Sequence, residues 1–473
     1  MYQVPQNITT PKIFIVQRSE TESRLDSHYN MPEYRELFGT LESLPCKLSS
    51  LRQESITIFS GTTPKSGGEA YCSVSNAIPF VRSGDFSDTN QIDFSETLHI
   101  KPEIHNGIMS ASKLRKNDLL VAIVGATIGK IGVYQYDKEA NINQAICAVR
   151  LKRSINPLYV QAFYQTNIGQ KIIERVKRPV ARANLNIEEV GALPIPLVDD
   201  KTQQKVVDTL QIGINEKLRK ESEAQQLLDS IDTYILDELG ISLPVIRTDL
   251  DSRIFVVNRR MFEDRFDPKF NKDIAYIRDL SCVYPWTSLD DVTIDNGQYG
   301  ANEKAKDYQR GDVRYIRITD IGELGNLKES DMKTAEYIDS SYMLHKDDIL
   351  FARSGSVGRC YIHKDMTAPA IFAGYLIRFV LNTNRINADY LFYYCNSKLY
   401  KYWVNTIQRP AVQANINAQE FRSMPIPLPP LAKQQEIADH ISNLRQRAKG
   451  LQAEGNQILE NAKKELGIRA KKI

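Results

Sequence analysis

The sequence lacks long hydrophobic runs. No apolar stretch in its 473 residues reaches the roughly 18 residues that a membrane-spanning helix requires. The first residues also lack the basic and then apolar pattern of a secretory signal peptide. We therefore expect a cytoplasmic protein without a membrane partner. Hydrophobic residues still make up 42% of the chain, which is enough to build the cores of about three domains.

The residue patterns of metal and disulfide chemistry are scarce. The six cysteines are scattered without a C-x-x-C pair. This arrangement argues against a zinc site and a disulfide framework, and it predicts buried free thiols. The six histidines include no H-E-x-x-H pattern, so a metal-dependent hydrolase has no candidate ligands. We expect no metal site in this chain.

The motifs of an amino-methyltransferase are missing as well. Such an enzyme needs an [ND]-P-P-[YF] stretch for the flipped base and a glycine-rich turn for its cofactor. The only adjacent prolines are Pro429 and Pro430, and no G-x-G occurs. Asp118 and Asp348 precede strand-like segments, where an aspartate is more often a turn residue than a catalytic one. We therefore expect no catalytic residue and no cofactor-binding residue.

One stretch, VGATIGK at 124–130, is similar to a phosphate-binding loop. Such a loop needs four residues between its glycines and a Ser or Thr after the lysine. Here three residues separate Gly125 from Gly129, and an isoleucine follows the lysine. A second copy, SGSVGR at 354–359, has one residue fewer between its glycines. A turn between two strands tolerates that loss and a phosphate loop does not, so the pattern predicts a repeated turn.

This turn belongs to a repeat that covers most of the chain. Segments 13–26 and 254–267 match without a gap, and RPVARANLNIEEVGALPIPL at 178–197 matches RPAVQANINAQEFRSMPIPL at 409–428. After each of the latter two segments, a Gln-Gln pair opens a long helical pattern that ends in E-L-G-I. The two E-L-G-I sequences lie at 238–241 and 465–468. The chain is therefore one unit written twice.

Each unit is expected to contain a mixed α/β domain. Short apolar runs bounded by turn residues, at 118–125 and 348–355, predict strands, and 155–166 predicts the start of a helix. Asn186 and Asn417 each precede a glutamate by three residues. This spacing predicts a structural capping box at the start of a short helix.

The long helical patterns carry apolar stripes that need a partner. From Pro430 onward, apolar or small residues follow the four-three spacing of a coiled coil, and the pattern from Lys201 to Leu239 has a similar stripe with a polar middle. The expected fold is α+β, with two similar mixed α/β domains joined by long helices that form an antiparallel coiled coil, and with an internal pseudo-twofold repeat. The expected boundaries are 1–200 and 246–429 for the domains, and 201–245 and 430–473 for the helices.

Local charge points toward nucleic acid. The net charge of +3 is too small to identify a partner, but segment 171–182 is strongly basic and segment 398–409 mixes basic with aromatic residues. Basic side chains among aromatic ones suit a phosphate backbone and base edges. The alternative is a solvated basic helix face beside a buried aromatic cluster, and these residues alone leave both interpretations open.

The repeated motifs resemble a known family. Three motifs occur twice in the same order, each time after a glycine turn: A-N-[IL]-N, P-I-P-L, and Q-Q at the start of a long helix. GTTP at 61–64 and IPFVRSGD at 78–85 add to the likeness. The sequence resembles the specificity subunit of type I restriction-modification enzymes. The resemblance implies two target-recognition domains that each read half of a bipartite double-stranded DNA site. It also implies spacer helices that dock two adenine methyltransferase subunits.

The same resemblance implies translocase-nuclease subunits in the full complex, and S-adenosylmethionine on the methyltransferase partners rather than on this chain. Two other functions remain open: a stand-alone sequence-specific DNA-binding regulator, and a coiled-coil scaffold that binds no DNA. As DNA contacts we choose basic residues near the repeated turns and the domain ends, because the arginine fork suits guanine edges and phosphates. The alternative for each is a surface ion pair. The chosen residues are Arg82, Lys130, Arg178, Arg182, Arg317, Arg353, Arg359 and Arg409.

Overall fold

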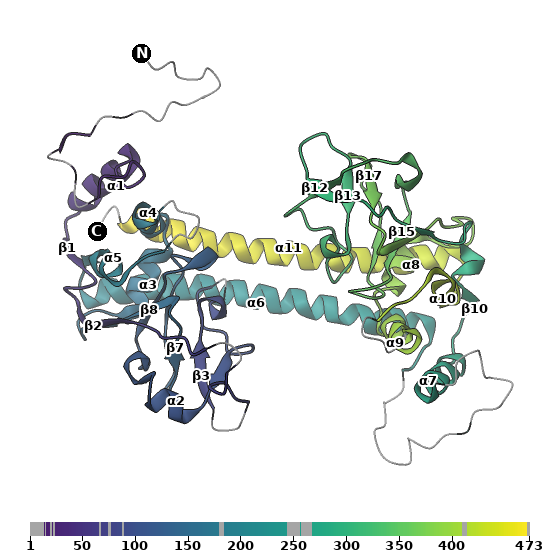
Figure 1. The fold of residues 1–473 in the computed structure, drawn as a ribbon, viewed down its shortest axis with the longest axis horizontal. Helices are drawn as coiled ribbons and strands as arrows, with labels where there is room; N and C mark the ends of the chain where they lie inside the picture. The colour runs from purple at the N-terminus through teal and green to yellow at the C-terminus, as the bar shows by residue number, and fades with distance from the viewer. Residues whose placement is uncertain are drawn as a thin grey trace. The chain divides into compact units, whose positions relative to one another are not determined.

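The chain forms two compact units in a computed structural model. Unit 1 comprises residues 1–221 with 452–473, and unit 2 comprises residues 222–451. The structure describes residues 14, 16–18, 21, 24–65, 68–73, 77–87, 89–178, 184–243, 256, 267–408 and 414–470. Arg182, Arg409 and most of segment 254–267 lie outside the described residues. Each unit contains helices and strands from one half of the repeat, together with part of both long helices (Figure 1).

Unit 1 is a mixed α/β structure around a four-stranded antiparallel sheet with strand order β2-β8-β5-β6. Its elements before the long helix are α1 (Pro32–Glu42), β1 (Lys47–Ser50), β2 (Ser55–Ser60), β3 (Ile78–Val81), η2 (Ser83–Asp85), β4 (Leu98–Ile100), α2 (Pro102–Asn106), η3 (Ser110–Ser112), β5 (Leu119–Ala122), η4 (Gly125–Thr127), β6 (Ile131–Val133), β7 (Asn141–Ile142), β8 (Ile146–Leu151), α3 (Pro157–Gln165), α4 (Asn167–Val176), α5 (Ile187–Ala192) and β9 (Pro194–Leu197). All four residues of β5 are buried, as expected for a central strand covered on both faces.

Unit 2 repeats this arrangement with the strand order β11-β18-β15-β16. Its elements are α7 (Pro268–Arg278), β10 (Trp286–Ser288), η7 (Asp290–Val292), β11 (Gln298–Tyr299), β12 (Ala305–Asp307), β13 (Arg314–Ile316), η8 (Ile318–Asp320), β14 (Lys333–Ala335), η9 (Ser340–Tyr342), β15 (Ile349–Ala352), β16 (Cys360–Ile362), β17 (Ala370–Phe372), β18 (Leu376–Phe379), α8 (Ala388–Tyr394), α9 (Lys398–Ile407), α10 (Ala418–Arg422) and β19 (Pro425–Pro427). The strands predicted at 118–125 and 348–355 and the helix predicted from 155 are confirmed.

Strand pairing outside the four-stranded sheets also repeats. β3 runs parallel to β7 in unit 1, and β13 runs parallel to β17 in unit 2. The P-I-P-L strands β9 and β19 pair antiparallel with β1 and β10. The hydroxyls of Tyr159 and Tyr164 donate to carbonyls of β9 at 2.8 and 2.7 Å, and Tyr390 and Tyr394 donate to the corresponding carbonyls of β19 at 2.7 and 2.6 Å. The two halves of the sequence therefore specify the same pairing for these strands, whereas the β3–β4 pair of unit 1 and the β12–β14 pair of unit 2 differ.

Two long helices, α6 (Asp200–Leu239) and α11 (Leu431–Ala470), follow the two mixed α/β regions. Within unit 1 the first part of α6 packs on the last part of α11, where Leu210 and Ile214 share a core cluster with Leu459. Gly213 allows a close approach there, since an added Cβ would lie 2.8 Å from that of Ala462. The two helices run in opposite directions here, because Lys220 follows Gly213 in α6 and pairs at 2.6 Å with Glu454, which precedes Ala462 in α11.

Within unit 2 the last part of α6 packs on the first part of α11, again with opposite chain directions. The ring of Tyr234 stacks on His440 with 4.0 Å between centroids, and Glu238, one turn later, pairs with the earlier Lys433 at 2.6 Å. Ile235 and Ile437 are fully buried in the same core cluster. The apolar stripes of both helices are therefore covered inside each unit.

The first long helix ends as its sequence predicts. Gly240 has φ +65°, its N–H donates to the Asp237 carbonyl at 3.0 Å, and the Ile241 N–H donates to the Leu236 carbonyl at 2.8 Å. This is a Schellman end, in which glycine tolerates the left-handed conformation. The second E-L-G-I does not end a helix, so that expectation was wrong: α11 continues through 465–468 to Ala470. At the first copy, the N–H of Val283 also bonds the Leu239 carbonyl at 3.0 Å and stabilises the end.

The cysteines and the helices bear on two further expectations. All six cysteines are free, as predicted, but only Cys147, Cys360 and Cys395 are buried, whereas the other three are partly exposed. Over the described part of the chain, no helix combines the length and the apolar character needed to cross a membrane.

Candidate nucleic-acid interface

The repeated glycine stretch is a turn between two antiparallel strands in both units. It joins β5 to β6 and β15 to β16. Gly125 and Gly129 have φ of +81° and +90°, and Gly355 and Gly358 have φ of +77° and +78°. Glycine is favoured at such positions because other residues are strained there. The prediction of a turn instead of a phosphate-binding loop is confirmed.

The N-[IL]-N part of the repeated motif lies beside the residues that lead from β5 or β15 into this turn. The Leu185 N–H donates to the Ile123 carbonyl in unit 1, and the Ile416 N–H donates to the Arg353 carbonyl in unit 2, both at 2.9 Å. The last asparagine of each motif begins a short helix: Asn186 accepts from the Glu189 N–H at 2.7 Å, and the glutamate accepts in return. The capping boxes predicted at Asn186 and Asn417 are confirmed.

A third segment completes the surface at the turn. The Ile123 N–H donates to the Ala145 carbonyl at 2.8 Å, and the Arg353 N–H donates to the Tyr375 carbonyl at 3.0 Å. Gly61 and Gly300 pack on these loops so closely that an added Cβ would lie within 2.4 Å of backbone oxygens. We call the resulting surface the turn face. It comprises residues 60–63, 123–127, 143–145 and 184–185 in unit 1, and residues 299–302, 353–356, 373–375 and 415–416 in unit 2.

The two turn faces share a backbone frame and differ in side chains. Ile123 of unit 1 corresponds to Arg353 of unit 2, and Ala145 corresponds to Tyr375, because each pair makes the same backbone hydrogen bonds. Ser60 corresponds to Tyr299 by strand register, since they pair with the equivalent residues Cys147 and Ile377. Unit 2 thus carries one arginine and two tyrosines where unit 1 carries small or aliphatic side chains.

Arg353 is held against an aromatic ring. Its guanidinium carbon lies 4.8 Å from the ring centre of Tyr299, which is a cation–π contact. Its Nε is buried without a hydrogen-bond partner. The Tyr299 hydroxyl accepts from the Ala418 N–H at 3.1 Å, and Tyr375 beside Arg353 exposes 62% of its surface. A guanidinium fork and an exposed phenol are side chains that can bind base edges or phosphates. The sequence-based choice of DNA contacts missed these two tyrosines, because no tyrosine stands at the equivalent positions in the first half of the repeat.

Arg82 and Arg317 occupy equivalent positions and are held by structural contacts. Arg82 pairs with the buried Asp85 at 3.2 Å, and Arg317 pairs with the buried Asp320 at 2.7 Å. Each guanidinium also donates to a carbonyl 14 residues away in the sequence, at 3.2 and 3.1 Å. The hydrogen bonds that Arg317 donates to the Asp320 carboxylate raise the pKa of Arg317. These contacts close a loop in each unit.

Lys130 and Arg359 follow the turns and also hold the loops in place. Lys130 Nζ donates to the Phe86 carbonyl at 3.1 Å, and Arg359 donates to the equivalent Ile321 carbonyl at 2.8 Å. The donors and acceptors are about 40 residues apart in the chain, so this pairing could not be predicted from the local sequence. The two basic residues connect the turn to the short helices η2 and η8.

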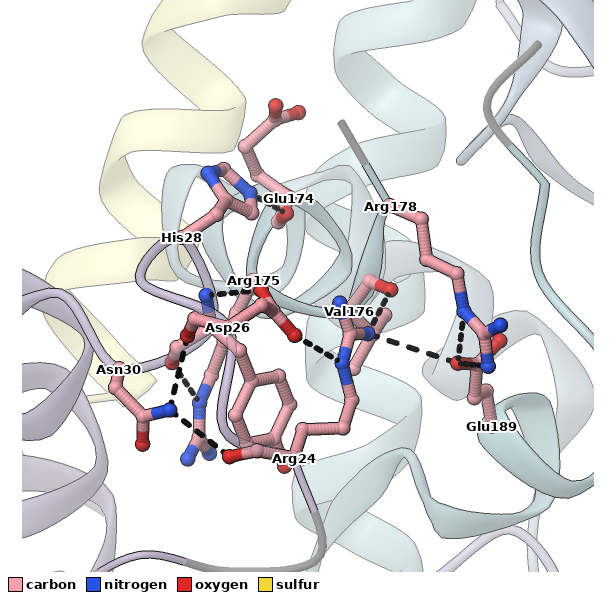
Figure 2. A network of polar contacts seen from close by, with 10 residues as sticks. Arg24, Asp26, His28, Asn30, Glu174, Arg175, Val176, Arg178 and Glu189 are labelled. Atoms are coloured by element: carbon pink, nitrogen blue, oxygen red, sulfur yellow. Dashed lines mark hydrogen bonds and ion pairs between the residues drawn. The ribbon is translucent and has the colours of Figure 1, made fainter. Parts of the chain in front are cut away.

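Arg178 belongs to a network at the start of α5. Figure 2 shows the guanidinium groups of Arg178 and Arg24 converging on the carboxylate of Glu189, at 2.9 and 3.5 Å. Arg24 also bonds Asp26 at 2.8 Å and the Val176 carbonyl at 2.6 Å. Arg178 remains 48% exposed at its side chain. Arg24 thus lies between the carboxylates of Asp26 and Glu189, and Arg178 is the more exposed of the two arginines.

The other members of the basic and aromatic segments are largely structural. Arg175 lies 4.0 and 4.2 Å from the ring centres of Tyr29 and Phe38. Tyr400 and Trp403 are buried, and the Tyr400 hydroxyl donates to the Gly358 carbonyl at 2.6 Å, behind the turn. The alternative of a buried aromatic cluster is confirmed for these two residues.

The repeated aspartates are turn residues, as predicted. Asp118 accepts from the Arg115 N–H at 2.7 Å and Asp348 from the His345 N–H at 2.9 Å. Burial raises the pKa of Asp348. In the described ranges, no group of three or more His, Cys, Asp or Glu side chains is arranged to hold a metal ion.

Comparison with known proteins places these features in a family. The sequence profile of the type I restriction modification DNA specificity domain matches twice, at residues 54–229 and 286–461. The StySPI specificity subunit of Salmonella potsdam is 20% identical over 423 residues, which are 85% of this chain and 83% of that protein. The EcoBI specificity subunit of Escherichia coli is 30% identical over 135 residues, a match that spans only 28% of each chain.

Solved structures include two related chains of similar length. One comes from a study of the assembly and conformational transition of the type I R-M system, with 14% identity, a TM-score of 0.49, and coverage of 90% of this chain and 96% of that one. The S subunit from M. genitalium has 13% identity, a TM-score of 0.41, and the same coverage. The two profile matches together cover more than half of the sequence, one in each repeat. The chain belongs to the type I restriction modification DNA specificity domain family and carries two copies of that domain.

Proposed function

We propose that this chain is the DNA sequence-specificity subunit of a type I restriction-modification complex. Each unit reads one half of a bipartite site in double-stranded DNA, and the turn face carries the reading side chains. The observation that supports this best is the pair of turn faces, which keep the same backbone hydrogen bonds and present different side chains. A shared frame with different side chains suits two readers of different sequences.

The chemistry of the two turn faces differs in a way that bears on their targets. Unit 2 offers Arg353 with Tyr299 and Tyr375, and an arginine fork is the commonest partner of the guanine O6 and N7 acceptors. Unit 1 offers Ile123 and Ala145 at the same positions, and apolar groups favour the thymine methyl. We therefore expect two unlike half-sites.

The other chosen basic residues have supporting roles in this proposal. Arg82, Lys130, Arg317 and Arg359 hold the loops around each turn through their structural contacts. Arg178 contacts phosphate, because its guanidinium group stays about half exposed although it pairs with Glu189. We retain Arg182 and Arg409 as DNA contacts on the strength of their sequence positions alone.

The long helices supply the other half of the function. α6 and α11, each 40 residues long, form an antiparallel coiled coil that fixes the number of base pairs between the half-sites. They also dock two adenine methyltransferase subunits, and translocase-nuclease subunits join the full complex. The chain itself is a non-catalytic recognition subunit in the cytoplasm, and S-adenosylmethionine binds to the methyltransferase subunits.

The proposal is tested by methylome sequencing in the native host and in a strain that lacks this chain. We expect loss of adenine methylation at one bipartite motif, and co-purification of the chain with an adenine methyltransferase. A stand-alone regulator would bind its site without that partner and leave the methylome unchanged. A scaffold would bind no DNA in a sequence-dependent manner. Either result would refute the proposal.

A further inference from the structure

A second basic surface lies in unit 1, at the end of the four-stranded sheet away from the turn face. Thr57 pairs with Arg150 at this end, whereas Ser60 pairs with Cys147 at the turn end. Two cavities of about 590 and 610 Å³ open here and share Lys116 and Arg150 in their walls. We call them together the sheet-end groove. Its basic residues are Lys113, Arg115, Lys116, Lys138, Arg150, Lys152 and Arg153.

Positive charge dominates the sheet-end groove. Its walls contain four acidic residues, Asp118, Asp137, Glu139 and Asp200, against the seven basic ones. The charge of Asp118 is neutralised by Arg150, whose guanidinium lies 2.7 Å from the carboxylate. Asp137 pairs at 2.7 Å with Lys116, but both side chains are at least half exposed and such pairs are weak. Lys152 also lies 3.9 Å from the carboxylate of Glu54. Basic side chains still outnumber acidic ones around the groove, which suits an anionic ligand.

A buried histidine points into the groove. His105 lines the first cavity and is completely buried. Asn141 donates from its amide nitrogen to the Met109 carbonyl at 2.8 Å and to Ser112 at 3.0 Å, so its oxygen accepts from His105 Nδ1. This fixes the ring, and Nε2 is left without a hydrogen-bond partner. Within the described part of the chain, the exposed carboxylate of Glu139 lies beside Nε2, at 3.4 Å.

The groove differs from the equivalent end of unit 2 at two of three neighbouring positions. Lys113 and Arg115 correspond in the repeat to Met343 and His345, whereas Lys116 corresponds to Lys346. These differences allow the two units to be compared with matched variants.

We propose that the sheet-end groove of unit 1 binds the phosphate backbone of DNA outside the bases that the turn faces read. The inference rests on the proposed function. The ligand chemistry is a phosphate group, because lysine and arginine side chains line both cavities and His105 lines the first cavity with its Nε2 lacking a hydrogen-bond partner. The two cavities share walls and are open, which suits a continuous strand better than a single small anion. Backbone contacts of this kind add affinity without sequence preference.

The test compares matched variants at equivalent positions of the repeat. The Arg115→Ala/Lys116→Ala double variant removes two basic side chains from the groove, and His345→Ala/Lys346→Ala is its counterpart in unit 2. Both pairs are exposed, so neither change threatens the fold. Each variant is purified in its native complex. Binding is measured against salt for a duplex with the methylated motif and for a duplex with both half-sites scrambled.

We expect the unit 1 double variant to lower the slope of log affinity against log salt by about two units on both duplexes, since each phosphate contact contributes about 0.9. The ratio of affinities for the two duplexes should stay the same, and the unit 2 double variant should change the slope far less. Glu139→Gln should strengthen binding to both duplexes, because it removes the one carboxylate that competes for His105. A purely structural role for Glu139 gives no such gain.

Equal slopes for the two double variants, or a Glu139→Gln variant that binds no better, would overturn the inference. If the wild-type complex still prefers the motif duplex in that case, the proposed function survives and the groove proposal alone fails. If the wild-type complex shows no preference, the proposed function itself fails. ATP serves as a probe for a free nucleotide: binding of ATP that the unit 1 double variant abolishes, with unchanged DNA slopes, would assign the groove to a nucleotide and refute the DNA-backbone proposal.

Discussion

Arg353→Ala is the perturbation that examines the turn face most sharply. The guanidinium stacks 4.8 Å from the ring centre of Tyr299, and its Nε lies buried without a partner. Removal of the side chain costs the fold little, about 0.5–1 kcal/mol for a cation–π contact near the surface. If the fork reads a base, removal costs about 1–3 kcal/mol of binding free energy, which corresponds to roughly 5-fold to 150-fold in affinity.

The assay is binding of the native complex to a panel of duplexes in which each position of the methylated motif is changed in turn. For wild type, a wrong base at the position read by Arg353 should cost about 1–3 kcal/mol. For Arg353→Ala that penalty should vanish at one position in one half-site, while the other half-site keeps its full discrimination.

Arg353→Lys is the matched control, because lysine keeps the charge and loses the planar fork. A base-reading arginine should lose discrimination in both variants. An arginine on phosphate should retain most of its affinity as lysine, and as alanine it should weaken binding to every duplex alike. Unchanged affinity and discrimination for both variants would refute a role of Arg353 in DNA binding.

The remaining predictions concern the frame, the helices and a buried thiol. Gln434→Ala should destabilise unit 2 by about 3 kcal/mol in urea denaturation. The reason is that the fully buried amide accepts from the Asn387 N–H at 2.7 Å and donates to the carbonyls of Arg385 and Pro429 at 3.2 and 2.8 Å. The control Gln435→Ala on the exposed side should cost less than about 1 kcal/mol, and equal effects of the two variants would contradict this account. Insertion of four residues between Lys217 and Glu223 adds about 6 Å to α6 and rotates the helix by little more than one turn. The spacer in the methylated motif should therefore grow by about one or two base pairs. An unchanged spacer in an active complex would show that the helices do not set the spacer length. Burial raises the pKa of Cys147 to about 12, so at pH 8 only about one thiol in ten thousand is ionised. Iodoacetamide should therefore leave this cysteine unlabelled until urea unfolds unit 1, as measured by peptide mapping. Rapid labelling of the native chain would mean that the core opens readily.

The parts of the fold that depend on local pattern could be predicted from the sequence. The glycine turn followed from comparing two copies of unequal length, and the capping boxes at Asn186 and Asn417 followed from a spacing of three residues. The strands β5 and β15 followed from short apolar runs. In the turns and the capping boxes the decisive interactions join residues close together in the chain, and the two strands were visible as continuous apolar runs.

The parts that depend on contacts between distant segments could not be predicted. The acceptor of Lys130 is a carbonyl 44 residues away, and the ring that stacks on Arg353 belongs to a strand 54 residues earlier. The second E-L-G-I repeats the letters of the first without the Val283 contact that stabilises the first helix end. A basic residue near a turn is visible in the sequence, but its partner is not.

The central claim is that the two units are independent readers of two half-sites. The most direct measurement replaces residues 13–197 with the equivalent domain of a relative that has a different target, and then sequences the methylome made by the chimera with its methyltransferase partner. We expect one half of the bipartite motif to change to that of the relative while the other half stays the same. A motif in which both halves change together, or in which neither changes although methylation persists, would contradict the account.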